Sequence, residues 1–342
     1  MATARLSSSA SRGRSGYTGV LLHRRTLGDN ASRVSAHSSV LAQGRASQSS
    51  PPRHGKQQQH DLSLPFPFLE PGARLPSSLK SAPFAGGCIV LVDKPQGWTS
   101  FDVCACVRNR FRRAYGVAKV GHTGTLDPMA TGLLVLCVGR ATKAVDSLTG
   151  APKRYEGVLR LGEETSSQDA DTDVTALRPW RQLTRGVLRA QAASMLGDLK
   201  QCPPMYSAVK VGGTRLYQLA RQGKVIERRA RDVRVDEFDL FFDVCSDGED
   251  EEKSSGTSPS SSSSPPENDD DMKVACQDVG FRVACSKGTY VRTLANDLGN
   301  AVGSAAHLTA LRRTHVREFS IENAWNLDQL CQSLVALADA EG

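Results

Sequence analysis

Several absences in the sequence narrow what the protein can be. No window holds the roughly 18 apolar residues that a membrane-spanning helix requires. There is no GxxxxGKS/T phosphate-binding loop, no GxGxxG dinucleotide motif and no HExxH zinc motif. The sequence therefore gives no support to a P-loop enzyme, a Rossmann-type dehydrogenase or a zinc metalloprotease.

Cysteine and histidine are also scarce in the patterns that metal or triad chemistry needs. The nine cysteines include no CxxC pair, and several lie in apolar segments, so we expect reduced core thiols rather than disulfides or zinc ligands. Four of the seven histidines fall within the first 60 residues, which leaves His122, His307 and His315 for the remainder. A catalytic triad built on histidine has little support.

Acidic residues are nearly missing from residues 1–60, which hold eight arginines, one lysine and one aspartate. The segment is rich in serine, alanine and glutamine and lacks the apolar core of a secretory signal, a composition typical of an organellar transit peptide. A basic tail that contacts nucleic acid is the alternative. We expect a disordered transit peptide at 1–60, followed by a linker at 61–83.

Acidic charge is instead concentrated in residues 246–272, which carry nine acidic residues and one lysine among many serines. Such a tract cannot bury enough apolar surface to order itself, so we expect a disordered insertion. Outside this tract and the first 60 residues, the chain holds 33 basic and 26 acidic residues. This balance suits a polyanionic partner but does not require one.

Hydrophobic periodicity predicts strands and helices in no regular βαβ order. The expected strands are 88–95, 133–139, 154–162, 225–244 and 281–285, and the expected helices begin near 99, 184 and 291. Residues 203–223 read as a strand, a Gly-Gly turn and a helix. We therefore expect an α+β fold with a mixed, largely antiparallel sheet flanked by helices and loops, in one domain at 84–330 with a tail at 331–342.

Asp127 lies in the turn-rich segment GHTGTLDPMATG (121–132), directly before the apolar run LLVLCVG. An aspartate before proline often only caps a turn, and this is one interpretation of Asp127. The chain also places Tyr290 and Arg292 at a strand-to-helix turn and Tyr155 at the start of an alternating strand. Arginine keeps a buried carboxylate ionised, and aromatic rings form a platform for an unstacked base. The combination favours a catalytic site, although each tyrosine alone also fits a core position.

The longer segment GHTGTLDPMATGLLVLCVGRATK (121–143) resembles the signature of the TruB family of pseudouridine synthases. Five more segments resemble its other motifs, in the same order: LVDKPQGWTSFDV (91–103), KRYEGVLRLGEETSSQDAD (153–171), PPMYSAVKVGGTRLYQLARQG (203–223), CSKGTYVRTLANDLG (285–299) and AHLTALRR (306–313). Six ordered motifs are far more specific than one short pattern. The resemblance spans about 85–330 and implies the pseudouridine synthase fold.

The resemblance implies that uridine in RNA is isomerised to pseudouridine, with no cofactor and no metal, because no group enters or leaves. Asp127 matches the family nucleophile, and a carboxylate suits this role because it can form a covalent adduct and leave again. Arg292 matches the arginine that pairs with this nucleophile. Tyr155 matches the tyrosine that stacks on the target base and moves a proton.

The remaining motif residues match positions around the substrate. His122 matches a histidine that wedges into the RNA, with a loop-shaping role as the alternative. Tyr290 and Leu311 match residues that line the uracil pocket, and Asp169 matches a polar residue near the active site. Lys94 is also a candidate for substrate binding, although a role in shaping the loop suits it better.

Stand-alone members of the family act on uridine 55 in the T-loop of tRNA, so tRNA, through its T-arm, is the expected partner. Organellar rRNA or mRNA is an alternative substrate, and a non-catalytic RNA-binding or tRNA-folding role is a second alternative. Basic residues at 215–234 and 101–113 are candidates for the RNA-binding surface, unless they are only solvated faces.

The sequence also departs from the family in ways that bear on its class and location. Only about 30 residues follow the last motif, so we expect no C-terminal PUA domain, and we favour a bacterial-type monomer with no obligatory protein partner and no membrane association. Thr172 follows QDAD where the family usually has glycine, so this loop could differ in shape. The basic leader favours a plastid location, with the mitochondrion second.

Overall fold

The computed structural model describes residues 66–80, 82–242 and 268–340. The chain divides into two units, Met1–His60 and Asp61–Gly342, and all the elements below belong to the second. The predicted transit peptide at 1–60 lies outside the described residues.

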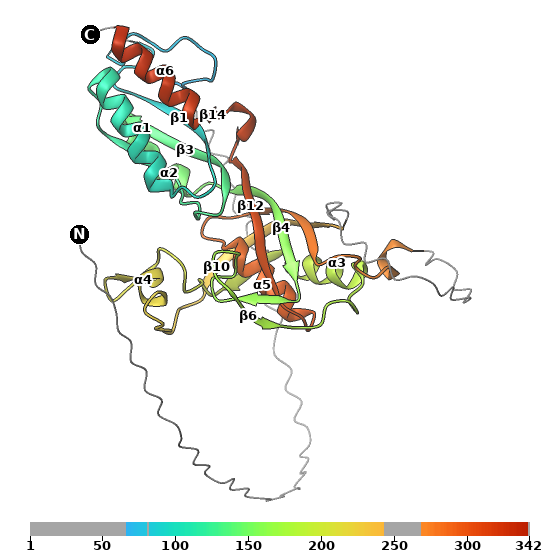
Figure 1. The fold of residues 1–342 in the computed structure, drawn as a ribbon. Helices are drawn as coiled ribbons and strands as arrows, with labels where there is room; N and C mark the ends of the chain where they lie inside the picture. The colour runs from blue at the N-terminus through green and yellow to red at the C-terminus, as the bar shows by residue number, and fades with distance from the viewer. Residues whose placement is uncertain (1–65, 81, 243–267, 341–342) are drawn as a thin grey trace, which may run out of the picture. The chain divides into compact units, whose positions relative to one another are not determined.

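The described residues form strands, α-helices and short 3-10 helices in an interleaved order (Figure 1). The strands are β1 (Gly87–Lys94), β2 (Val120–His122), β3 (Thr131–Gly139), β4 (Lys153–Leu161), β5 (Glu163–Thr165), β6 (Val174–Leu177), β7 (Gly197–Gln201), β8 (Lys210–Val211), β9 (Thr214–Arg215), β10 (Arg231–Phe241), β11 (Asp278–Cys285), β12 (Ala306–Val316), β13 (Phe319–Ser320) and β14 (Trp325–Asn326). The helices are α1 (Ser100–Tyr115), α2 (Val145–Thr149), α3 (Arg185–Ser194), α4 (Leu216–Ala220), α5 (Val291–Ala301) and α6 (Leu327–Ala340), and the 3-10 helices are η1 (Arg140–Ala144), η2 (Asp269–Asp271) and η3 (Ile321–Asn323).

Ten strands form one sheet in the order β14-β1-β3-β12-β4-β11-β10-β7, with β13 beside β12 and β2 beside β3. The pairs β1–β14 and β3–β12 are parallel, and the other pairs in this sheet are antiparallel. Separate hairpins are formed by β5–β6 and by β8–β9. The expected α+β class, with a mixed and largely antiparallel sheet, is confirmed.

Strands β1 and β3 are covered on both faces. Alternate residues of β1, such as Val90 and Val92, pack in one apolar cluster with α1 and α6, whereas Ile89 and Leu91 pack in another with η1 and α2. A strand buried on both sides reads as a continuous apolar run rather than an alternating one. This explains the LLVLCVG segment that follows the Asp127 loop.

Helix α1 begins in a capping box. The Thr99 hydroxyl accepts a hydrogen bond from the Asp102 amide, and the Asp102 carboxylate accepts one from the Thr99 amide. Because Thr99 is the cap, Ser100 is free to point elsewhere. Helix α6 lies alongside α1 (Figure 1), and both pack on the same face of β1 and β3. No helix of the described residues is long and apolar enough to cross a membrane.

Two predicted boundaries of the domain are wrong. The expected linker at 61–83 contains Leu69 and Leu79, which are buried in the core, and Phe68 pairs with Ile89 of β1. Residues 331–340 of the expected tail at 331–342 belong to α6, which buries Leu330 and Leu334. In both places apolar side chains reach the core, so these segments belong to the fold.

The expected disordered insertion at 246–272 is also too long. Its end, residues 268–272, includes η2, where Asp269 and Asp270 form ion pairs with Arg185 and Arg189 of α3. These ion pairs attach η2 to α3. The rest of the predicted insertion, up to residue 267, lies outside the described residues.

Three smaller expectations need correction. The turn at Gly212 and Gly213 is where the sequence places it, but it joins two-residue strands, and α4 is only five residues long. The strands expected over 225–244 reduce to β10. Cys276 is disulfide-bonded, whereas the other described cysteines are free thiols as expected.

Candidate active site

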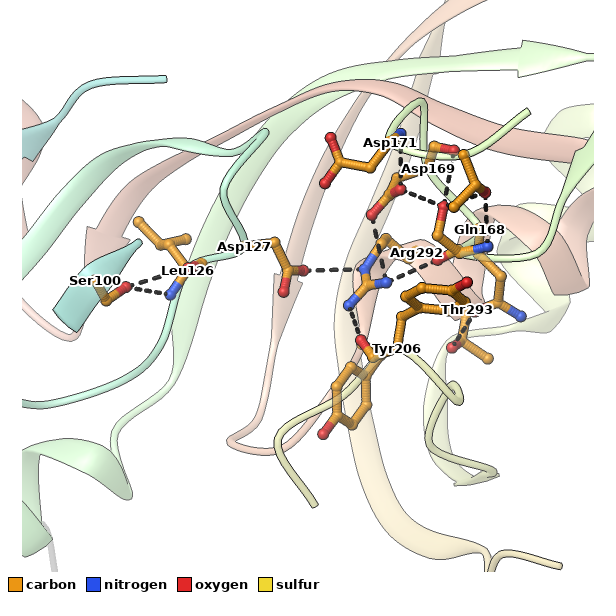
Figure 2. A network of polar contacts seen from close by, with 12 residues as sticks. Ser100, Leu126, Asp127, Gln168, Asp169, Asp171, Tyr206, Arg292 and Thr293 are labelled. Atoms are coloured by element: carbon orange, nitrogen blue, oxygen red, sulfur yellow. Dashed lines mark hydrogen bonds and ion pairs between the residues drawn. The ribbon is translucent and has the colours of Figure 1, made fainter. Parts of the chain in front are cut away.

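The loop between β2 and β3 holds Asp127 by its neighbouring peptide groups (Figure 2). The Ser100 hydroxyl accepts a hydrogen bond from the Leu126 amide at 2.8 Å and donates one to the Leu126 carbonyl at 3.2 Å. Ser100 is buried at the start of α1, so this fork fixes the residue before Asp127. The Asp127 carbonyl then accepts a hydrogen bond from the Ala130 amide at 3.1 Å.

Lys94 supports the same loop from β1. Its ammonium donates to the carbonyl oxygens of Pro95 at 2.9 Å, Trp98 at 2.6 Å and Pro128 at 3.3 Å. Burial lowers the pKa of Lys94 to about 8, while the charge of Asp127 opposes this shift. All three donors of the ammonium are occupied, so the geometry favours the loop-shaping role of Lys94 over substrate binding.

Arg292 joins two carboxylates that lie far apart in the sequence (Figure 2). Its Nε atom lies 2.9 Å from Asp127 Oδ2, and its Nη1 atom lies 3.3 Å from Asp169 Oδ2. The guanidinium also donates to the carbonyls of Ser167 at 2.7 Å and Tyr206 at 2.8 Å. The side chains of Arg292 and Asp169 are each 3% exposed, whereas that of Asp127 is 35% exposed. Asp127 is therefore the carboxylate that a substrate can reach.

The electrostatic setting of Asp127 is a balance. Burial raises the pKa of its carboxyl above the ordinary value, Arg292 opposes this rise by charge and hydrogen bonding, and Asp169 adds to it. One edge of the carboxylate faces solvent while the rest is enclosed by protein. Such a group is a nucleophile only while its arginine keeps it ionised.

The loop between β5 and β6 positions Asp169. Its Oδ1 atom accepts hydrogen bonds from the Ser167 hydroxyl and, at 3.0 Å, from the Asp171 amide. Thr172 completes this loop, because its hydroxyl accepts a bond from the Ser167 amide at 3.1 Å and lies 2.8 Å from the Ser167 hydroxyl. Thr172, which stands where the family usually has glycine, thus closes the loop around Asp169.

Tyr155 and Leu311 form the apolar side of the site. Both are buried and belong to one cluster with Leu126 and Met129, which flank Asp127 in the sequence. Burial raises the pKa of the Tyr155 phenol, and Arg313 opposes this rise through its charge and a hydrogen bond. The phenol therefore stays protonated at neutral pH beside the Asp127 loop.

Arg313 is the main residue that the sequence interpretation missed. It is 1% exposed, faces Tyr155 across the β12–β4 ladder, and donates to the carbonyls of Leu133 at 2.7 Å and Gly124 at 3.1 Å. It thereby ties the start of the Asp127 loop to the strand that follows it. Its signal in the sequence is its place two residues after Leu311, which puts both on one face of a strand.

A glycine allows this close approach. Gly132, with φ of 103°, pairs with Arg313, and a Cβ atom on it would meet the Arg313 carbonyl oxygen at 2.3 Å. Only a residue without a side chain fits here. The last glycine of GHTGTLDPMATG is thus explained by packing.

Tyr290 and His122 lie at the ends of elements. The Gln201 side chain accepts a hydrogen bond from the Tyr290 amide at 2.7 Å and donates one to the Tyr290 carbonyl at 3.1 Å, which fixes the residue before α5. His122 ends β2, half-buried, and burial together with the charge of Arg313 lowers its pKa. Its Nδ1 atom is buried and has no hydrogen-bond partner in the part of the chain that the structure describes.

The basic stretches differ in how freely they present charge. In 215–234, Arg215 and Arg221 lie over the ring of Tyr217, whereas Arg234 is paired with Asp198 and Asp236. In 101–113, Arg108 lies over the exposed ring of Phe101 and Arg113 is paired with Asp339. Within the described ranges, no group of three or more His, Cys, Asp or Glu side chains could hold a metal ion.

Two family models match the chain. The model "TruB family pseudouridylate synthase (N terminal domain)" matches residues 112–247, and "tRNA pseudouridylate synthase B C-terminal domain" matches residues 292–341. The second match covers Arg292, Arg313 and all of α6.

Curated relatives agree with this assignment. A protein named "tRNA pseudouridine synthase B" from Mycobacterium avium (strain 104) is 44% identical over 244 residues, covering 71% of this chain and 69% of the relative. One of the same name from Opitutus terrae is 42% identical over 242 residues, covering 71% of this chain and 86% of the relative.

Among solved structures, a chain in the "Crystal Structure of a Cbf5-Nop10-Gar1 Complex" aligns with 25% identity and a TM-score of 0.46. The alignment covers 72% of this chain and spans about half of that chain, 54%. The two family models and the curated relatives together establish the assignment: this chain belongs to the TruB family of pseudouridylate synthases.

Proposed function

We propose that this protein isomerises uridine to pseudouridine in tRNA, at position 55 of the T-loop, with Asp127 as nucleophile. The observation that carries the proposal is the ion pair of 2.9 Å between Arg292, which is almost fully buried, and Asp127, which is partly exposed. The names of the curated relatives support tRNA as the substrate class.

The reaction follows from these positions. A carboxylate oxygen of Asp127 bonds to C1′ of the flipped nucleotide as the N1–C1′ bond breaks, and the bonding electrons leave with the uracil. The uracil turns against Tyr155 and Leu311, and its C5 atom attacks C1′ and displaces the carboxylate. Loss of the C5 proton and protonation of N1 complete the isomerisation without an external reactant. Arg292 keeps the Asp127 carboxylate charged and oriented before the attack, and it pairs with the carboxylate again when C5 displaces it from C1′.

The direct test is Asp127→Asn in the full chain. We expect pseudouridine formation on a tRNA transcript to fall at least about 1,000-fold, with tRNA affinity changed by no more than about threefold. Asp146→Asn, which changes an exposed aspartate of α2, is the matched control and should retain full activity. A wild-type chain that binds tRNA but forms no pseudouridine would instead support the folding or binding role.

The substrate position is tested with altered RNA. A tRNA in which uridine 55 is replaced by cytidine should gain no pseudouridine, and an isolated T-arm hairpin should remain a substrate. Modification of an organellar rRNA fragment at a comparable rate would favour the rRNA alternative. Because the purified chain is used alone, activity in this assay also tests our proposal that a monomer suffices without a protein partner.

The plastid location is a separate proposal that rests on the composition of residues 1–60. Residues 1–83 fused to a fluorescent protein should direct it to plastids. Accumulation in mitochondria would select the second location, and a diffuse signal would contradict targeting.

A further inference from the structure

Two thiols face each other between α1 and α6, away from the residues proposed for catalysis. The Sγ atoms of Cys106 and Cys331 lie 3.4 Å apart and share a hydrogen bond, and both residues are half-buried. A disulfide has an S–S length of about 2.05 Å, so the two sulfurs need to approach by about 1.4 Å.

The helices that carry these thiols are firmly placed. Val103, Val107 and Phe111 of α1 pack in one buried cluster with Leu330 and Leu334 of α6. Outside this cluster, Arg113 and Asp339 form an ion pair of 2.6 Å between the same two helices. The encounter of the two thiols is therefore a property of the helix packing and not of loop motion.

A cation lies beside the thiols. Arg110 follows Cys106 by one helical turn, and its Nε atom is buried without a hydrogen-bond partner among the described residues. Burial, followed by the hydrogen bond and charge of Cys106, raises the pKa of Cys331 to about 12, while Arg110 opposes this rise. Either thiol can donate the hydrogen bond between the two sulfurs, and the guanidinium of Arg110 is close enough to Cys331 to favour a thiolate there.

We propose that Cys106 and Cys331 form a site of reversible oxidation, which a small-molecule disulfide converts into an intramolecular cross-link between α1 and α6. The Cys106 thiolate attacks one sulfur of the oxidant, whose S–S bond breaks and releases one thiolate. The Cys331 thiol then loses its proton and attacks Cys106 Sγ, which releases the second thiolate. The two protein thiols are oxidised, the oxidant is reduced to two thiols, and the charges balance.

The cross-link encloses a long stretch of chain that includes every residue proposed for catalysis. Ser100, which fixes the Leu126 peptide beside Asp127, lies on the same helix as Cys106. The expected consequence is resistance to unfolding, because linking residues distant in sequence restricts the unfolded chain. The inference does not depend on the proposed RNA chemistry.

The test uses the full chain incubated with oxidised glutathione or with dithiothreitol. Peptide mass mapping of the oxidised sample should show Cys106 joined to Cys331, and the melting temperature should rise by about 5 °C or more over the reduced sample. In Cys106→Ser that difference should shrink to whatever the other cysteines contribute, Cys276 included. Cys202→Ser, which removes an exposed thiol, should behave as wild type.

Other outcomes overturn the proposal. A stable glutathione adduct on Cys106 without the cross-linked peptide means that Cys331 does not resolve it. A melting difference in Cys106→Ser as large as in the wild type means that another pair is responsible. Wild-type mass mapping needs no variant, so it decides the question even if Cys106→Ser folds poorly. As a further arm, Arg110→Gln should slow cross-linking several-fold while Arg110→Lys keeps most of the rate.

Discussion

Two buried arginines flank the Asp127 loop, and they use their charge differently. Arg292 is matched by the carboxylates of Asp127 and Asp169, so its charge is neutralised where it lies. The hydrogen bonds of Arg313 go to the backbone carbonyls of Leu133 and Gly124, and it forms no ion pair with a carboxylate among the residues that the structure describes. Its charge instead opposes the rise in the pKa of the Tyr155 phenol. Arg292 thus fixes the nucleophile Asp127, whereas the charge of Arg313 acts on the groups around it.

The difference is visible in the groups around Arg313. Its positive charge contributes to the lowered pKa values of His122, Lys153 and Lys94, although burial is the larger cause in each case. A cation that is not neutralised by an acid makes neighbouring cations easier to deprotonate. The region around Arg292 should therefore control the rate, and the region around Arg313 should control stability and protonation.

The largest effect is expected from Arg292→Leu. Without its cation, Asp127 protonates more readily, and we expect the rate of pseudouridine formation to fall at least about 1,000-fold at neutral pH. The residual rate should recover as pH rises, because the pKa of Asp127 then lies higher than in the wild type. Arg292→Lys, measured alongside, should lose less. A pH–rate profile of Arg292→Leu with the wild-type shape would contradict the pairing.

A smaller effect on rate, with a larger one on stability, is expected from Arg313→Gln. The change leaves buried carbonyls short of donors, which should lower the free energy of unfolding by about 2–4 kcal/mol in urea titrations. The rate on tRNA should fall about 10- to 100-fold. The Asp127 loop would lose its hydrogen-bonded connection to β3, and Tyr155 would lose the cation opposite it. The pKa of His122, followed by NMR, should rise. If it stays unchanged, Arg313 does not govern this region as argued.

The stability of the protein at alkaline pH tests the region around Arg313, because Lys153 lies in it. Lys153 donates to the carbonyls of Thr149 and Ala151, and burial lowers its pKa from 10.5 to about 8. Between these two values the unfolded chain binds the proton more tightly, so the stability contributed by Lys153 rises with pH over that window. From pH 8 to 10.5 the unfolding free energy of the wild type should therefore rise by about 2 kcal/mol relative to that of Lys153→Met. A difference independent of pH would contradict the shift.

The smallest effect is expected from Thr172→Val, which removes one hydroxyl from the loop that holds Asp169. The variant keeps the shape of the side chain but loses the bonds to Ser167. We expect the rate to fall about two- to fivefold. This corresponds to the energy of about one hydrogen bond, whose loss reaches Asp127 through Asp169 and Arg292. Thr172→Ser should retain wild-type activity. Equal losses in both variants would point to packing rather than to the hydroxyl.

Much of the site could be predicted because its residues lie in motifs. Asp127, Arg292 and Asp169 were named from three segments, and the ion pairs join all three. Arg313 was missed because arginine is rarely buried, so a pair of arginines reads as surface. Only the strand register, which places it opposite Tyr155, identifies it.

The domain limits were less predictable, for a physical reason. The expected linker is 61–83, yet a few apolar residues such as Leu69 and Leu79 suffice to attach the described part of that segment to the core. In α6, Leu327, Leu330 and Leu334 recur at helical spacing. This spacing predicts a helix that continues into the segment expected to be a tail. Composition averaged over a window hides such sparse contacts.

Strand β12 carries a consequence for how the chain can vary. Bulges at Thr309 and Thr314 bracket the segment that places Arg313 beside Tyr155, while the adjacent Arg312 reaches Asp93. Losing a single residue within that bracket would exchange the two arginines between faces and remove the tie to Tyr155. Between β10 and β11, by contrast, residues 243–267 lie in the connection between the strands and outside their paired residues. Natural variation in chain length should therefore be frequent at that connection and nearly absent between the two bulges of β12.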